Sequence, residues 1–271
     1  MQFLSSIPLV VTSALVIFSP LQEGGTTHVA QMIIRFLILA WAGGALALSI
    51  RQGRLTIPLL SVRYFVLVFL GFAVIATMFS PYAHPSRQWL FTIICYATLF
   101  YLLVSFVDRW EHVHTLTIVV VLMGVGEAAL TILQGLVWND MRPSGTFFNP
   151  NFLAGYLAVS WAILLSAAVY GYRRTAALHW LPISPTLWWF GVGASLGSLF
   201  LAVLLTQSRG GMIVVLVATV FIVMARYGWK VAGSCLVLLM VGGLLIPTPL
   251  RERVQAEHQQ NPVSYARLQM W

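Results

Sequence analysis

Long apolar segments follow one another along this chain, with short polar breaks between them. Most contain about twenty residues and little charge, which is the length that an α-helix needs to cross the hydrocarbon core of a bilayer. Strands of a membrane barrel would be about ten residues long and would alternate in polarity. The pattern predicts about nine membrane-spanning helices: 4–21, 29–50, 59–79, 89–107, 115–137, 150–170, 188–206, 211–225 and 231–246.

The composition agrees with an all-α, multi-pass membrane protein. Hydrophobic residues make up 59% of the 271 residues and charged residues 8%, whereas soluble domains carry about 25% charged residues. No Lys or Arg precedes the first apolar segment and no small-residue cleavage motif follows it, so we interpret it as a retained helix. The sequence predicts a transmembrane domain over 1–246, followed by the start of an outer loop over 247–271.

The basic residues predict the orientation of the chain. The net charge of +8 comes from 15 Lys and Arg against 7 Asp and Glu. Because these charges fall mainly in loops, they favour contacts with anionic membrane lipids over a nucleic-acid partner. Loops on one side hold Arg51, Arg54, Arg109, Arg173, Arg174, Arg226 and Lys230, and loops on the other hold Arg87, Arg142 and Arg209 before the tail. The positive-inside rule therefore predicts a cytoplasmic N-terminus and places the second set of loops outside.

The outer break at residues 142–151 has the features of an anion site. Arg142 supplies a positive charge, and Gly145 together with the preceding proline favours a turn. Asn149 before Pro150 is typical of a helix N-cap followed by proline at the first helical position. We expect the N–H groups and the partial positive charge of that helix end to attract a phosphate beside Arg142. The alternative is an ordinary capped loop.

A second outer break, from Ser208 to Gly211, resembles the first in character. Arg209 offers a planar fork of donors that suits a phosphate. The two glycines that follow permit a positive φ and a close approach of another group to the backbone. A tight turn with an arginine that reaches the headgroups is the alternative. Three outer loops with one arginine each favour a shared anionic ligand, for which Arg35 and Arg87 are the weaker candidates.

Glu127 lies near the middle of the predicted fifth span. A bare carboxylate there is costly, so Glu127 must be paired, protonated or directed into a wet cavity. Gln134 lies seven residues later on the same helical face and closer to the outer side. Arg35, about two turns into the second span, is a candidate partner of Glu127 or a ligand contact. A buried structural pair remains the alternative.

Cofactor chemistry has no support in the sequence. No metal-ligand spacing, Walker loop or dinucleotide-binding motif occurs. Cys95 and Cys235 both lie inside apolar segments and are expected to behave as small core residues. The sequence therefore predicts no cofactor and no metal site.

Two segments carry a resemblance to a known family. Residues 142–157, RPSGTFFNPNFLAGYL, resemble a segment of the O-antigen ligase and O-antigen polymerase superfamily, and residues 206–211, TQSRGG, resemble its S-R-G segment. The order of the two segments and their common outer face also agree, and so does Gln134 at the end of the preceding helix. The resemblance covers most of the chain.

The resemblance implies an inner-membrane glycosyltransferase that needs no metal. Such enzymes move a glycan from undecaprenyl diphosphate to lipid A-core, and in relatives to a growing glycan or a protein hydroxyl, on the periplasmic side. It implies diphosphate binding by Arg142 and Arg209, with Arg35 and Arg87 as weaker candidates. Gly145, Asn149, Asn151 and Ser208 would shape the loops or contact sugar.

The family pattern continues beyond the last residue of this chain. Its general base is a histidine of a large periplasmic loop, which would begin near Trp271, and the context of His258 does not match that histidine. We therefore expect a chain that is truncated before the loop and inactive alone, with no catalytic base visible. Two hypotheses of another class stay open: a transporter whose pathway is lined by Glu127, Arg35 and Gln134, and a non-catalytic membrane scaffold.

Overall fold

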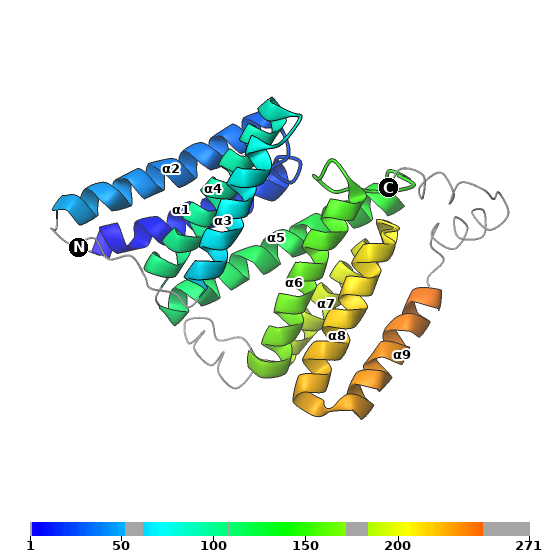
Figure 1. The fold of residues 1–271 in the computed structure, drawn as a ribbon. Helices are drawn as coiled ribbons and strands as arrows, with labels where there is room; N and C mark the ends of the chain where they lie inside the picture. The colour runs from blue at the N-terminus through cyan, green and yellow to red at the C-terminus, as the bar shows by residue number, and fades with distance from the viewer. Residues whose placement is uncertain (1, 52–61, 108, 172–183, 246–271) are drawn as a thin grey trace. The chain divides into compact units, whose positions relative to one another are not determined.

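The computed structural model describes residues 2–51, 62–107, 109–171 and 184–245, and this part of the chain is helical without strands (Figure 1). Its helices are α1 (Gln2–Leu21), α2 (His28–Arg51), α3 (Arg63–Met78), α4 (Ala83–Phe106), α5 (Trp110–Leu136), α6 (Pro150–Gly171), α7 (Pro185–Leu205), α8 (Arg209–Tyr227) and α9 (Trp229–Leu245). The all-α prediction is confirmed for these residues. The tail from 247 to 271, with His258, lies outside them, as do Arg54, Arg173 and Arg174.

Six of these helices are long and apolar enough to cross a membrane, namely α2, α4, α5, α6, α7 and α8. Shorter apolar helices occupy Pro8–Leu21, Arg63–Met78 and Trp229–Val241. These lengths and compositions indicate a multi-pass membrane protein. The count of about nine spans and the cytoplasmic N-terminus stay predictions.

The largest difference between a predicted span and its helix concerns α4. The sequence places its start at residue 89, whereas α4 begins at Ala83. Pro85 lies in the first turn, where a missing N–H costs no helical hydrogen bond, and the backbone N–H of Ser86 donates to the carbonyl of Tyr82 at 3.1 Å. Arg87 therefore lies in a helix, and its predicted position in a loop is wrong.

The chain forms two compact units, Met1–Val119 and Val120–Trp271. In the first unit, α2 and α4 pack together, and α1 and α3 pack on them. Its small core contains the buried side chains of Leu15, Ile38 and Cys95. The N-terminal part of α5 belongs to this unit by its residue numbers, and the C-terminal part to the second unit.

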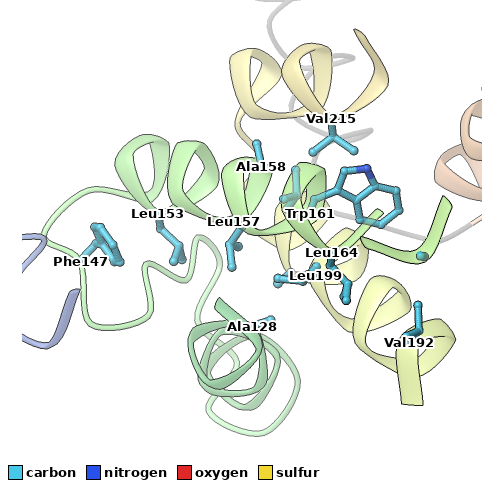
Figure 2. Close-up of a cluster of buried hydrophobic side chains, with 13 residues drawn as sticks. Ala128, Phe147, Leu153, Leu157, Ala158, Trp161, Leu164, Val192, Leu199 and Val215 are labelled. Carbon is cyan, nitrogen blue, oxygen red and sulfur yellow. The ribbon is translucent and has the colours of Figure 1, made fainter. Parts of the chain in front are cut away.

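The second unit has the larger apolar core (Figure 2). Buried side chains from α5, α6, α7 and α8 meet there, among them Ala128, Leu157, Leu199 and Val215. α6 packs against both α7 and α8, and α9 packs against α8. The candidate residues of the 142–151 and 208–211 breaks all belong to this unit.

α6 and α8 run parallel at close distance. Near their N-terminal ends Gly211 faces Ala154, and a Cβ on Gly211 would lie 2.5 Å from the Ala154 Cβ. In the middle, Trp161 Nε1 donates to Thr219 Oγ1 at 2.9 Å, with both side chains buried. Small residues permit this approach inside a membrane, where helices gain stability from van der Waals contact and interhelical hydrogen bonds. The two helix N-termini therefore lie side by side.

We expect Gly211→Ala to lower the free energy of unfolding by about 1–3 kcal/mol relative to Gly210→Ala, because the added methyl group overlaps Ala154. Gly210→Ala is the matched control: nothing lies within 4 Å of its Cβ position, and both changes add the same helix propensity. Unfolding in detergent, followed by tryptophan fluorescence, measures the difference. Equal stabilities of the two variants would contradict the close contact between Gly211 of α8 and Ala154 of α6.

Candidate functional site

The two sequence motifs meet at one end of the second unit. We call residues 137–149, which join α5 to α6, the linking segment. Arg142 Nε of this segment donates to the backbone carbonyl of Thr206 at 3.2 Å, and Gln207 Nε2 donates to the carbonyl of Met141 at 2.5 Å. The end of α7 and the start of α8 are thereby bonded to the linking segment, although more than sixty residues separate the partners along the chain.

Arg142 is tied to the protein on two sides. Besides its bond to Thr206, its Nη2 donates to Asn151 Oδ1 at 2.9 Å. The side chain is half-buried, and its own backbone N–H donates to Asp140 Oδ1 at 3.1 Å. Arg142 therefore connects the linking segment with the first turn of α6 and the end of α7.

Arg209 is the first residue of α8 and is exposed. Ser208 caps the helix, since its Oγ accepts from the Gly211 N–H at 3.3 Å. The two glycines do not use the positive φ that they permit, because both already lie in the right-handed helix. Gln207 instead adopts the left-handed conformation, with φ +54°. The close approach at Gly211 does occur, but its partner is Ala154.

The predicted N-cap at Asn149 is confirmed. Its Oδ1 accepts from the Asn151 N–H at 2.8 Å, and its carbonyl accepts from Phe152 at 3.0 Å and Leu153 at 3.2 Å. Pro150 has no N–H to offer. The expected N–H donors for a phosphate at this helix end are therefore already used by the protein. What α6 still contributes is the positive end of its dipole.

Glu127 and Gln134 both bind the linking segment. The Glu127 carboxylate is only 3% exposed and accepts from the Thr146 N–H at 3.0 Å and from the Thr146 hydroxyl at 2.6 Å. The Gln134 side chain accepts from the Gly145 N–H at 2.7 Å and donates to the Gly145 carbonyl at 2.9 Å. The Glu127 carboxylate is therefore hydrogen-bonded, and both of these donors belong to a residue 19 positions later in the next polar segment.

Thr146 is the residue of this site that the sequence analysis missed. It lies inside the motif segment, next to Gly145, and supplies both donors to Glu127. The seven-residue spacing of Glu127 and Gln134, which places both on one face of α5, was the signal that could have found it. A buried Glu127 carboxylate needs hydrogen-bond donors, and the loop that follows α5 is the nearest polar segment that could supply them.

Arg35 and Arg87 belong to the first unit and stay predictions for this site. Arg35 donates through Nη2 to Gln31 Oε1 at 3.0 Å and to Thr92 Oγ1 at 2.5 Å. Its guanidinium also lies 5.5 Å from the centre of the Phe91 ring, a cation–π distance. These contacts tie α2 to α4 within that unit.

Gly145→Ala is expected to destabilise the protein by about 2 kcal/mol or more. Gly145 has φ +61°, which disfavours a side chain, and an added Cβ would overlap Oε2 of Glu127. Gly126→Ala on α5 is the control, because its Cβ would meet nothing within 4 Å. Detergent unfolding compares the two. Two variants with wild-type stability would show that Gly145 is not confined by Glu127.

Neither a metal cluster nor a known relative identifies this site. Among the described residues, no group of three or more His, Cys, Asp and Glu side chains could hold a metal ion. No protein-family model, curated protein or solved structure matches the chain. What the site can do must therefore be argued from its own charges and donors.

Proposed function

We propose that this chain belongs to a membrane glycosyltransferase of the O-antigen ligase type, which moves a glycan from undecaprenyl diphosphate to an acceptor hydroxyl at the periplasmic face of the inner membrane. Lipid A-core is the proposed acceptor, and a growing glycan or a protein hydroxyl is the alternative within the same superfamily. The support lies in two motif segments, 142–157 and 206–211, that resemble that superfamily and contact each other.

The bond between Arg142 and Thr206 is the observation that carries the proposal. It joins the two segments at the end where α6 and α8, packed in parallel, present their N-termini side by side. Two positive helix ends and the guanidinium groups of Arg142 and Arg209 give this end of the second unit a basic surface. A lipid diphosphate, with two phosphates beside an apolar tail, fits such a surface at a membrane boundary.

The reaction needs stabilisation of the leaving group above all. The acceptor oxygen attacks the anomeric carbon of the glycan, the bond to the diphosphate oxygen breaks, and the diphosphate leaves with the electron pair. Positive groups held in advance near that oxygen stabilise the charge as it develops. The acceptor proton passes to a base, for which the family resemblance implies a histidine of the large outer loop.

Arg142 and Arg209 have different roles in the proposed site. Arg209 is exposed at the first position of α8 and is the direct phosphate contact. Arg142 bonds Thr206 and Asn151, so it holds the site together and adds its charge. Asn151 and Ser208 shape the loops on either side.

Arg209→Ala should lower glycan transfer by roughly a hundredfold or more, the cost of removing one preorganised charge donor. Arg209→Lys should retain part of the activity, because it keeps the charge without the planar fork. The measurement is glycan attachment to the acceptor by the full-length protein in cells without other transfer activity, normalised to the amount of protein in the membrane.

Arg226→Ala is the matched control, since Arg226 is an exposed arginine in the last turn of the same helix. It should leave transfer unchanged. Wild-type transfer by both Arg209→Ala and Arg142→Ala, at normal membrane levels, would exclude the proposed diphosphate site.

A further inference from the structure

We propose that Glu127 is a positioning residue: its buried carboxylate, together with Gln134, clamps the linking segment and so fixes where Arg142 lies. The role of the clamp in transfer rests on the proposed function, whereas the clamp itself does not. Neither residue needs to touch substrate. Glu127 acts through the N–H and hydroxyl of Thr146, and Gln134 acts through the backbone of Gly145.

The first point of the clamp is the carboxylate of Glu127. Each of its two oxygens accepts a hydrogen bond from Thr146, one from the N–H and one from the hydroxyl. At 3% exposure the carboxylate has little contact with solvent that could replace these donors. If the linking segment moved away, a buried carboxylate would lose both partners, which is far costlier than losing an ordinary surface hydrogen bond.

The second point is the amide of Gln134, two helical turns further along the same face of α5. Its oxygen and nitrogen bind the N–H and the carbonyl of Gly145, so the amide fixes the orientation of that residue as well as its distance. Gly145 fits because its φ is +61° and because a Cβ there would overlap the Glu127 carboxylate. A rigid helix thus holds two adjacent residues of the linking segment.

The clamp reaches Arg142 through a short and restricted path. Only Pro143, whose side chain is fully buried, and Ser144 separate Arg142 from Gly145. From that place the guanidinium reaches Thr206 and Asn151. Displacements of about 1 Å in such a group are enough to impair a reaction that depends on orientation. The position of Arg142 therefore depends on Glu127 through the linking segment.

The burial of Glu127 also bears on the hypothesis of a transport pathway. A carboxylate that carries ions or protons through a membrane must meet water or a partner that exchanges. Glu127 instead has both oxygens bonded to a neighbouring segment of its own chain. This environment favours a fixed clamp.

Thiol labelling tests the clamp without any need for activity. The full-length protein, with Cys95→Ala and Cys235→Ser and with Ser144→Cys as the reporter in the linking segment, is treated with a maleimide in membranes. Thr146→Val, which loses the hydroxyl donor, and Glu127→Gln, which loses an acceptor, should each raise the labelling rate roughly tenfold, as expected for a lost hydrogen bond to a charged group.

Thr131→Val and Thr146→Ser are the matched controls. Thr131 is buried on α5, and its hydroxyl donates to the Glu127 carbonyl within its own helix. Its loss leaves the bonds to the linking segment in place and should keep labelling within about twofold of the parent, since such bonds within one helix contribute little. Thr146→Ser keeps the hydroxyl and should label like the parent. Unchanged labelling in both Thr146→Val and Glu127→Gln would overturn the clamp.

Transfer kinetics separate the clamp from the proposed function. Thr146→Val should raise the KM for the lipid-linked donor more than it lowers kcat, and Thr146→Ser should restore both. Faster labelling combined with wild-type transfer by Arg209→Ala would leave the clamp standing and remove the proposed function. If Thr146→Val and Glu127→Gln label as slowly as the parent while Arg209→Ala is inactive in transfer, the clamp is excluded and the proposed function stands.

Discussion

A carboxylate surrounded by apolar helices must be hydrogen-bonded, and in this chain that requirement connects α5 to the segment that follows it. Glu127 binds both donors of Thr146, and a residue that is only 3% exposed has little contact with solvent that could replace them. The linking segment is consequently held against α5 from the inside. Gly145, Arg142 and the start of α6 take their positions from that attachment.

The helices of this protein were largely predictable because each must satisfy its own backbone inside the membrane. Apolar length therefore located α1 to α9 to within a few residues. The start of α4 was missed, since the polar residues before position 89 were read as a loop. Pro85 is in fact compatible with a first turn, where proline is tolerated, and Arg87 follows in the helix as an exposed residue.

The site was predictable only where the interaction is local. Asn149 caps α6 through its own neighbours, so the Asn-Pro pattern identified the cap. The bond of Arg142 to Thr206 joins parts of the chain that are 64 residues apart, and periodicity carries no information on it. The close approach at Gly211 was expected, but its partner, Ala154 of another helix, could not be identified from the sequence.

The contact between Ala154 and Gly211 has a consequence for the electrostatics of the site. Because these residues are small, α6 and α8 approach each other closely near their N-termini, and the positive ends of both dipoles add at one place. The first N–H groups of α6 already bond Asn149. In the proposed site the end of α6 would therefore attract an anion only through its electric field, and arginine side chains would make the direct contacts. A wider helix pair would separate Arg209 from the segment that holds Arg142, so the proposed diphosphate site depends on the small residues at positions 154 and 211.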